Sequence, residues 1–309
     1  MLNQQEREQL KTKILKNNEL YVLQYSRLRR LLKDPFRTSL FYCIALFARI
    51  HPYKIHARTL WNDTMTYFLP EGQAIYYYGF FEANLTNFLI NFLQEGDTFV
   101  DIGAHVGYYS VLSSRLVGDS GHVHSFEPTP RTFISLEENT RHLHNVSINN
   151  VALLNEEKEI EFIDYGPKNS AFNGFKRRIS EEMNFLKKDD SAIKVKAIAL
   201  DSYCRKNNLQ PTFIKIDAEG AESLILSGMT YVMSELRPII SIEVAGGEEW
   251  KANCKNSIEM LLSHDFVAYE STLVGGLKKH VQQVQYKYDN LICIPKEKEE
   301  EVVTRMLKY

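Results

Sequence analysis

The sequence predicts an α/β fold in which a mostly parallel sheet of seven strands carries helices on both faces. From Thr98 onward, short apolar segments alternate with segments of helical periodicity, a pattern typical of such sheets. A glycine-rich turn follows the first apolar segment. The composition, with 44% hydrophobic and 25% charged residues, is that of a globular protein. The expected strands span residues 98–102, 122–126, 147–151, 212–216, 238–244, 265–269 and 290–295.

Helical patterns lie between most of these strands, because apolar residues recur there at intervals of three and four positions. Two further segments, residues 159–164 and 194–200, interrupt the alternation and predict an added hairpin. The polar segment 165–191 between them is expected to form a surface loop, whose basic residues are candidates for acceptor contact or simply solvated. The expected helices span residues 82–94, 107–117, 130–143, 219–235 and 255–264.

The chain ahead of this alternation predicts a separate extension. Residues 1–34 contain no proline or glycine and predict a helix, and residues 37–50 predict a second, largely buried one. Between residues 61 and 78, β-forming residues flank a turn at positions 70–72, which predicts a hairpin with residues 76–78 as its second strand. We therefore divide the chain into an extension (1–75), a main α/β domain (76–297) and a tail helix (298–309).

Charge and cysteine content limit the partners and the compartment. The net charge of −2 gives no general case for nucleic acid, yet residues 1–60 carry twelve Lys or Arg against four acids. The four cysteines are far apart, which predicts buried, reduced thiols in a cytoplasmic protein. The charged N-terminus does not resemble a secretion signal. The longest apolar run, of about 12 residues, is shorter than the roughly 20 that a membrane span needs.

The motif FVDIGAHVGYYS at residues 99–110 predicts a nucleotide-binding turn. An apolar strand leads into Gly103, and a helix begins near Gly107, so that backbone amides face a ligand. The acid Asp101 lies in the strand itself, where a carboxylate suits the cationic methionine end of S-adenosylmethionine better than a pyrophosphate. Glu127, 20 residues beyond Gly107, follows the next strand and could accept hydrogen bonds from both ribose hydroxyls.

The motif alone leaves two alternatives to an enzyme that uses S-adenosylmethionine. A nicotinamide-dependent oxidoreductase uses a similar sheet, although Asp101 and the absence of a GxGxxG motif disfavour it. A non-catalytic module that binds adenosylmethionine within a glycan-assembly complex would be expected to have a damaged site. Here Asp101, Gly103, Gly107 and Glu127 are all present.

The sequence resembles the FkbM family of methyltransferases from about Tyr78 to Pro295. The resemblance rests on Glu82, VDIGAHVGYYS at 100–110, FEPTP at 126–130, ALDSY at 199–203, IKIDAEGAESLILSGM at 214–229, IISIEV at 239–244 and NLICIP at 290–295. It implies a class I (Rossmann-like) methyltransferase fold, S-adenosyl-L-methionine as cofactor, and a hydroxyl acceptor on a sugar, polyketide or lipid-linked glycan. The candidate cofactor-binding residues are Glu82, Asp101, Gly103, Ala104, His105, Gly107, Ser110, Glu127, Pro128, Val151 and Ala152.

Charged residues at the ends of the fourth and fifth strands are the catalytic candidates. In an open α/β sheet the acceptor binds beyond the carboxyl ends of the strands. We expect Asp217 to act as base or orienter of the acceptor hydroxyl, with Lys215 and Glu243 beside it. Lys215 and Glu243 could instead form a structural ion pair. Asp217 and Glu243 could also hold Mg²⁺, but we expect no metal.

The basic, apolar N-terminal segment has two interpretations. It could form a lid that shapes the acceptor pocket, which we favour, or it could contact the inner membrane surface peripherally. Either suits an acceptor that is a small molecule or a glycan. The sequence gives no oligomeric state.

Overall fold

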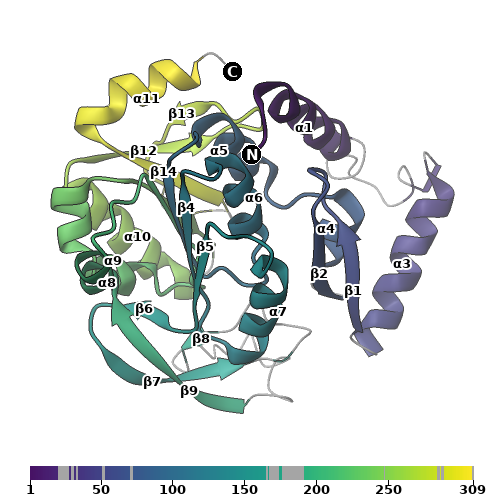
Figure 1. Ribbon diagram of the computed structural model, residues 1–309, viewed down its shortest axis with the longest axis horizontal. Helices are drawn as coiled ribbons and strands as arrows, with labels where there is room; N and C mark the ends of the chain where they lie inside the picture. Colours follow the sequence, from purple (N-terminus) through teal and green to yellow (C-terminus); the bar gives the residue numbers. More distant parts are fainter. Residues whose placement is uncertain are drawn as a thin grey trace.

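The chain folds around one large central sheet, as the computed structural model shows (Figure 1). The sequence alternation predicted this arrangement, and the strands are buried because helices cover both faces. The structure describes residues 1–19, 28, 31, 32, 34–50, 53–69, 72–164, 166, 174, 175, 191–246, 248–283, 286 and 289–307. The basic residues of segment 165–191, most residues between 20 and 33, and the turn residues Pro70 and Glu71 lie outside the described residues.

Among the described residues, the central sheet has eight strands in the order β13-β12-β14-β11-β10-β3-β4-β5. Neighbouring strands from β5 to β11 run parallel, whereas β14 is antiparallel to both β11 and β12. All seven expected strands are present, and only the short edge strand β13 was not predicted. Their bounds are β3 Thr98–Ile102, β4 His122–Phe126, β5 Val146–Asn149, β10 Phe213–Ile216, β11 Ile239–Val244, β12 Phe266–Ser271, β13 Leu277–Lys279 and β14 Asp289–Pro295.

Alternating strand residues supply the two halves of the core. Phe99 and Phe213 pack toward α5 and α6, whereas Val100 and Ile214 pack toward α8, α9 and α10. The expected helix 219–235 is broken at Gly228, so α9 and a following π-helical turn (Val232–Leu236) replace it. The helices are α5 Ala83–Phe92, α6 Tyr108–Val117, α7 Pro130–Thr140, α8 Leu200–Asn207, α9 Glu222–Ser227, α10 Glu248–Ser263 and α11 Glu299–Met306.

The added hairpin is confirmed. Strand β7 pairs with β9 in antiparallel fashion, and the two belong to a small sheet in the order β6-β9-β7-β8. The small sheet lies below the central sheet in Figure 1. Its strands are β6 Ala152–Leu154, β7 Lys158–Asp164, β8 Gly174–Phe175 and β9 Ser191–Ala199.

The N-terminal hairpin differs from the prediction in its pairing. Strand β2 (Thr64–Leu69) pairs with β1 (Tyr53–Arg58), which precedes it, and not with residues 76–78. The turn between β1 and β2 closes through Thr59, whose hydroxyl accepts from the Asp63 amide. The tyrosines instead belong to helix α4 (Gln73–Tyr78), because Gly79 adopts φ 82° and ends a helical turn there.

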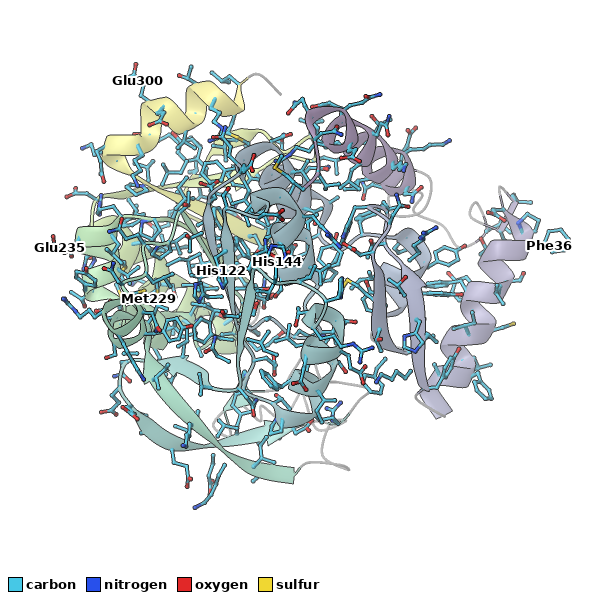
Figure 2. All side chains as sticks on the ribbon, in the orientation of Figure 1. Phe36, His122, His144, Met229, Glu235 and Glu300 are labelled. Carbon is cyan, nitrogen blue, oxygen red and sulfur yellow. The ribbon has the colours of Figure 1, made fainter. Side chains whose placement is uncertain are left out.

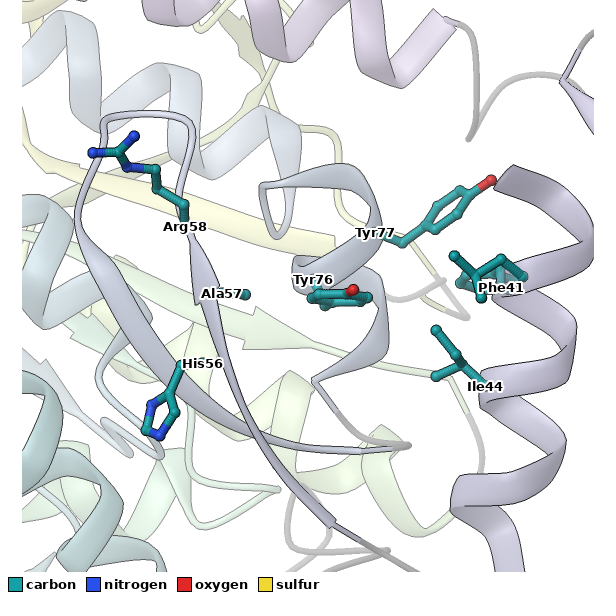
Figure 3. Close-up of a pocket in the computed structure, with 8 residues that line it drawn as sticks. Phe41, Ile44, His56, Ala57, Arg58, Tyr76 and Tyr77 are labelled. Carbon is teal, nitrogen blue, oxygen red and sulfur yellow. The ribbon is translucent and has the colours of Figure 1, made fainter. Parts of the chain in front are cut away.

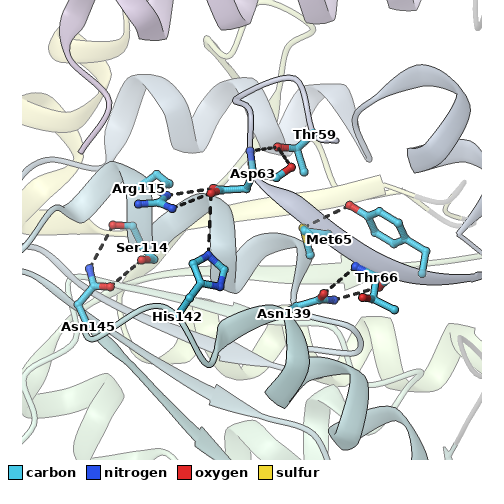
Figure 4. Close-up of polar contacts among 10 residues, drawn as sticks. Thr59, Asp63, Met65, Thr66, Ser114, Arg115, Asn139, His142 and Asn145 are labelled. Atoms are coloured by element: carbon cyan, nitrogen blue, oxygen red, sulfur yellow. Dashed lines mark hydrogen bonds and ion pairs between the residues drawn. The ribbon is translucent and has the colours of Figure 1, made fainter. Parts of the chain in front are cut away.

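Side chains fasten this hairpin to the central domain (Figure 4). Asp63 accepts two hydrogen bonds from the guanidinium of Arg115 on α6. Asn139 of α7 accepts from the Thr66 amide and donates to the carbonyls of Thr66 and Val106. These bonds therefore fix the position of the hairpin relative to the turn that follows β3.

Among the described residues ahead of the hairpin are helices α1 and α3. Helix α1 (Gln4–Asn17) packs on α5 and buries Leu10 and Ile14, and it matches the first part of the expected helix 1–34. Helix α3 (Pro35–Ile50) lies at the outer edge of the molecule, where Phe36 projects away from it (Figure 2). A pocket of about 340 Å³ lies between α3, β1 and α4 (Figure 3). Helix α3 is largely exposed on one side, contrary to the burial predicted for residues 37–50.

Three of the four cysteines are buried and all four are free, whereas Cys43 is exposed. Among the described residues, no helix is both long and apolar enough to cross a membrane. Helix α11 agrees with the predicted tail helix, and the domain boundaries at residues 75 and 297 stay predictions.

We expect the substitution Asn139→Ala to destabilise the fold by about 3 kcal/mol. It would leave the buried amide of Thr66 and the carbonyl of Val106 without their partner, and an orphaned buried group costs about 1–3 kcal/mol. Chemical denaturation would measure this loss. The control Asn207→Ala removes an exposed bond to the Tyr203 carbonyl and should cost less than about 0.5 kcal/mol. Equal losses in the two variants would contradict the proposed anchoring.

Candidate functional site

The turn after β3 brings the ends of three strands together. The amides of Gly103 and Ala104 both donate to the Phe126 carbonyl at the end of β4, each at 3.0 Å. Gly103 has φ 75°, and a Cβ atom there would lie 1.8 Å from the Asp217 carbonyl oxygen beyond β10. Glycine is therefore required for backbone contact with the β10 loop as well as for the turn itself.

Gly107 ends the turn and begins α6. Its φ is 90°, and a Cβ atom there would approach the Leu136 side chain at 2.7 Å. His105 also has positive φ, at 52°. The first two residues of α6, Tyr108 and Tyr109, then line the cavity beside the turn. The turn thus positions a helix N-terminus at the cavity, as the motif predicted.

Asp101 is fully buried beneath this turn. Its Oδ2 accepts a hydrogen bond of 2.6 Å from the Ser110 hydroxyl, which in turn accepts one from Ser125. Its Oδ1 lies 3.8 Å from Lys215 Nζ and has no hydrogen-bond partner among the described residues. Burial raises the pKa of Asp101, although Lys215 and Ser110 oppose the shift. Ser110, a predicted cofactor residue, therefore contacts the acid rather than the cavity surface.

Glu127 lies directly after the carboxyl end of β4. Its Oε2 accepts from the His105 amide at 3.0 Å and its Oε1 from the Thr129 amide at 2.9 Å. Burial raises the pKa of Glu127, and His105 and Thr129 oppose that shift. Asn150 donates to the carbonyls of Glu127 and Pro128, which holds the segment leading to Val151 and Ala152 against this strand end.

Lys215 is the centre of the charged groups. It is 2% exposed, and its ammonium donates to Asp217 Oδ2 at 2.9 Å. It also lies 5.0 Å from the centre of the Tyr109 ring. Burial alone would lower the pKa of Lys215, but the charges of Asp217, Asp101 and Glu82 outweigh it and raise that pKa. The lysine therefore stays charged and fixes the orientation of the Asp217 carboxylate.

Glu243 lies beside this pair, as its place at the end of β11 predicted. Asp217, Glu219 and Glu243 each offer a carboxylate oxygen, and these oxygens lie within 4.8 Å of one another. Burial and the negative charges of Asp217, Glu219 and Glu222 raise the pKa of Glu243 well above its ordinary value. The raised pKa favours the uncharged form of Glu243, which lessens the repulsion among these acids. The alternative Lys215–Glu243 ion pair is not what forms, because Lys215 pairs with Asp217 and Asp101.

Two other acids have positioning contacts. Glu222 is completely buried, and its Oε1 accepts from the amides of Ala218 and Gly220, so it holds the turn after β10. Glu82 accepts from the Tyr109 hydroxyl and from the Asn290 amide group of β14. Glu82 therefore ties α6 to the strand that neighbours Glu243.

A cavity of about 140 Å³ lies over these strand ends. It brings together five predicted site residues (Gly103, Ala104, His105, Lys215 and Asp217) among its lining residues. Sequence reasoning missed its aromatic wall, which comes partly from the N-terminal hairpin. The further lining residues are Tyr67, Phe68, Gly72, Ile75, Phe81, Val106, Tyr108 and Tyr109.

The sheet order defines the class of protein. Numbered along the chain, the seven predicted strands lie in the order 3-2-1-4-5-7-6 with the seventh antiparallel, and the site lies at the carboxyl ends of the first, second, fourth and fifth. This is the arrangement of a class I methyltransferase, as the sequence resemblance implied. A model of the methyltransferase FkbM domain matches residues 101–284, more than half of the chain, and the chain belongs to this family. Methyl transfer therefore replaces the nicotinamide-dependent alternative.

Individual relatives have low sequence identity to this chain. The hexuronic acid methyltransferase AglP of Haloferax volcanii is 27% identical over 184 residues, which cover 59% of this chain and 70% of AglP. The methyltransferase FkbM of Methylobacillus flagellatus superimposes with a TM-score of 0.43 at 13% identity, over 72% of this chain and 65% of that one, less than two thirds of its length. The O-methyltransferase TomG of Streptomyces achromogenes gives 0.40 at 12% identity, over 69% and 78%.

The substitution Gly103→Ala should destabilise the fold by more than the positive φ of residue 103 alone explains. An L-residue in the left-handed region costs about 1–2 kcal/mol, and this term is shared by the control Gly96→Ala, whose φ is 88° and whose nearest neighbour is 3.8 Å away. The clash with the Asp217 carbonyl should add about 1–3 kcal/mol at position 103 alone. Chemical denaturation of both variants measures the difference. Equal losses would mean that the strand ends do not touch.

Glu243→Gln should alter how stability depends on pH. Because the folded protein keeps the Glu243 proton while the unfolded chain loses it above its ordinary pKa of 4.5, stability falls as pH rises from 4.5 to the raised folded pKa. A glutamine has no proton to lose. The variant should therefore gain stability relative to the wild type as the pH rises through this window. Thermal unfolding at a series of pH values tests this, and a constant difference would contradict it.

Proposed function

We propose that this methyltransferase transfers a methyl group from S-adenosylmethionine to a hydroxyl oxygen of a sugar. The observation that carries the proposal is the Lys215–Asp217 pair, which lies in the wall of an aromatic-lined cavity beside the Gly103 turn. A carboxylate that a buried ammonium holds in place at this edge of the sheet can accept a hydrogen bond from an acceptor hydroxyl and orient it. The pair thus joins the nucleotide-binding turn to a proton acceptor.

The donor side fits the groups that S-adenosylmethionine presents. Each oxygen of Glu127 already accepts one backbone amide and can accept one further bond, which suits the two ribose hydroxyls. The buried acceptor Asp101 Oδ1 provides negative potential beneath the Gly103 turn for the cationic methionine end. When bound, this cofactor would supply an activated methyl group on a sulfonium ion.

Asp217 carries the proton step. Methyl transfer to a hydroxyl would release the hydroxyl proton, and the Asp217 carboxylate in the cavity wall would accept it. Lys215 keeps the Asp217 carboxylate directed, since their atoms are 2.9 Å apart. Burial and the charge of Asp217 raise the pKa of Glu243, which favours an uncharged Glu243 beside Asp217.

The acceptor class follows from the cavity wall and from the named relative. Tyr67, Phe68 and Phe81 present aromatic surface, against which the apolar face of a sugar ring packs. The relative AglP is named for a hexuronic acid, a sugar with both hydroxyl and carboxylate oxygens. We place the methyl group on a hydroxyl because the cavity wall contains a proton acceptor, Asp217. An ionised carboxylate acceptor has no proton to remove.

The deciding experiment measures methyl transfer and donor binding in one pair of proteins. With S-adenosylmethionine and a panel of sugar and uronic acid acceptors, we expect Asp217→Asn to lower kcat by about 10²–10⁴-fold. Calorimetric titration of the donor should give a similar Kd for both proteins, because Asp217 acts on the acceptor. The control Asp97→Asn makes the same change just before β3, at the edge of the sheet opposite the site, and should retain activity.

The remaining outcomes separate the alternatives. Donor binding without transfer to any acceptor would favour a non-catalytic module. Release of the product methyl group by mild alkali would show an ester and contradict hydroxyl transfer. Activity that is lost in EDTA and restored by Mg²⁺ would assign a metal ion to Asp217, Glu219 and Glu243 and contradict the expectation of no metal.

A further inference from the structure

The outer face of α3 carries a continuous apolar stripe. Phe36, Leu40, Cys43 and Phe47 follow one another at intervals of four, three and four residues, which places them along one side of the helix. Leu46 lies next to them. The exposed fractions are 89% for Phe36, 66% for Leu46, 57% for Phe47 and 56% for Leu40. Figure 2 shows Phe36 at the outermost edge of the molecule.

The opposite face of the same helix packs on the protein. Thr38 and Ala48 are buried, and the Phe41 ring lies 4.5 Å from the ring of Tyr77. An amphipathic surface helix would show polar residues on the side away from this contact. Helix α3 shows an apolar stripe there instead, and such a contiguous patch is typical of an interaction surface.

The charge of this region identifies the partner. Helix α3 contains two arginines, Arg37 and Arg49, and no acid. Residues 1–60 carry a formal charge of +8, from twelve basic and four acidic residues, while the rest of the chain carries −10. A second copy of the same face would be repelled by this charge, whereas an anionic surface would be attracted. An anionic bilayer offers negative headgroups and an apolar interior together.

We propose that the outer face of α3 docks on the surface of an anionic phospholipid bilayer. The helix, about 24 Å long at 1.5 Å per residue, lies in the plane of the interface with Phe36, Leu40 and Leu46 among the acyl chains. The helix does not cross the bilayer.

A pocket lies directly behind α3 (Figure 3). Leu40 and Ile44 of α3 line one side, and His56 and Arg58 of β1 together with Tyr76 of α4 line the other. Leu40 belongs to both the pocket and the stripe. In Figure 3 the Arg58 side chain projects away from α3, so the proposed bilayer contact rests on the apolar stripe and on the charge of this region.

Helix α4 connects this surface to the active site. Tyr76 and Tyr77 line the pocket beside α3, while Ile75 lines the cavity that contains Asp217. The two cavities therefore lie on either side of one helix, whose diameter is about 10 Å. Docking would bring the proposed active site close to the bilayer, within reach of a sugar attached to a lipid; this consequence rests on the proposed function.

Vesicle flotation of the full chain tests the docking surface. We expect the protein to float with phosphatidylcholine vesicles that contain phosphatidylglycerol and not with phosphatidylcholine alone, and to be released by high salt. The double variant F36S/L40S should bind at least about tenfold more weakly. The control I134S/L262S replaces two apolar residues that are similarly exposed on α7 and α10, and it should bind like the wild type.

Several results would overturn the proposal. They are equal binding of F36S/L40S and wild type, equal binding to neutral vesicles, and no binding at all. A dimer in light scattering that F36S/L40S abolishes, without vesicle binding, would assign the face to a second copy. Circular dichroism shows whether each variant is folded. Asp217→Asn should float like the wild type, so failed docking and failed methyl transfer are distinguishable.

Discussion

The buried ammonium of Lys215 is the interaction on which the site depends. A charge that is 2% exposed is tolerated only with partners, and here Asp217 and Asp101 come from the loop after its own strand and from the neighbouring strand. The parallel register sets Lys215 directly between Asp101 and Ser241. Because the lysine must keep both carboxylates, the relative positions of β3, β10 and the loop after β10 are all constrained.

The same constraint joins the proposed donor and acceptor sides. Gly103 allows the Asp217 carbonyl to touch the turn after β3, and the Gly103 amide is held by Phe126 at the end of β4. Glu127 then binds the His105 amide of that turn. A displacement of Asp217 would therefore move the turn and the neighbouring strand end together. In the proposed mechanism this coupling aligns the acceptor oxygen with the methyl group, a step sensitive to small displacements.

The sequence predicted the parts of the protein in which local pattern and topology agree. All seven strands follow from apolar segments, and the proximity of Asp217 and Glu243 follows from their places at adjacent strand ends. The pairing of β1 with β2 did not follow, because three tyrosines at 76–78 resemble a strand and only Gly79 marks a helix end. The aromatic wall was missed for another reason. Tyr67 reaches the cavity through tertiary bonds of Asn139, which no local pattern shows.

The N-terminal extension then has two roles, one as a wall of the cavity and one in the proposed membrane contact. Its inner side is fixed by Asp63 and Asn139, and it completes the cavity with Tyr67 and Phe68, as a lid would. Its outer side carries the apolar stripe, and its sequence is rich in Lys and Arg while the rest of the chain is acidic. An anionic surface would attract the first region and repel the second, which orients the molecule before any apolar contact forms. Lid and proposed membrane contact are therefore compatible, because they use opposite sides of the same extension.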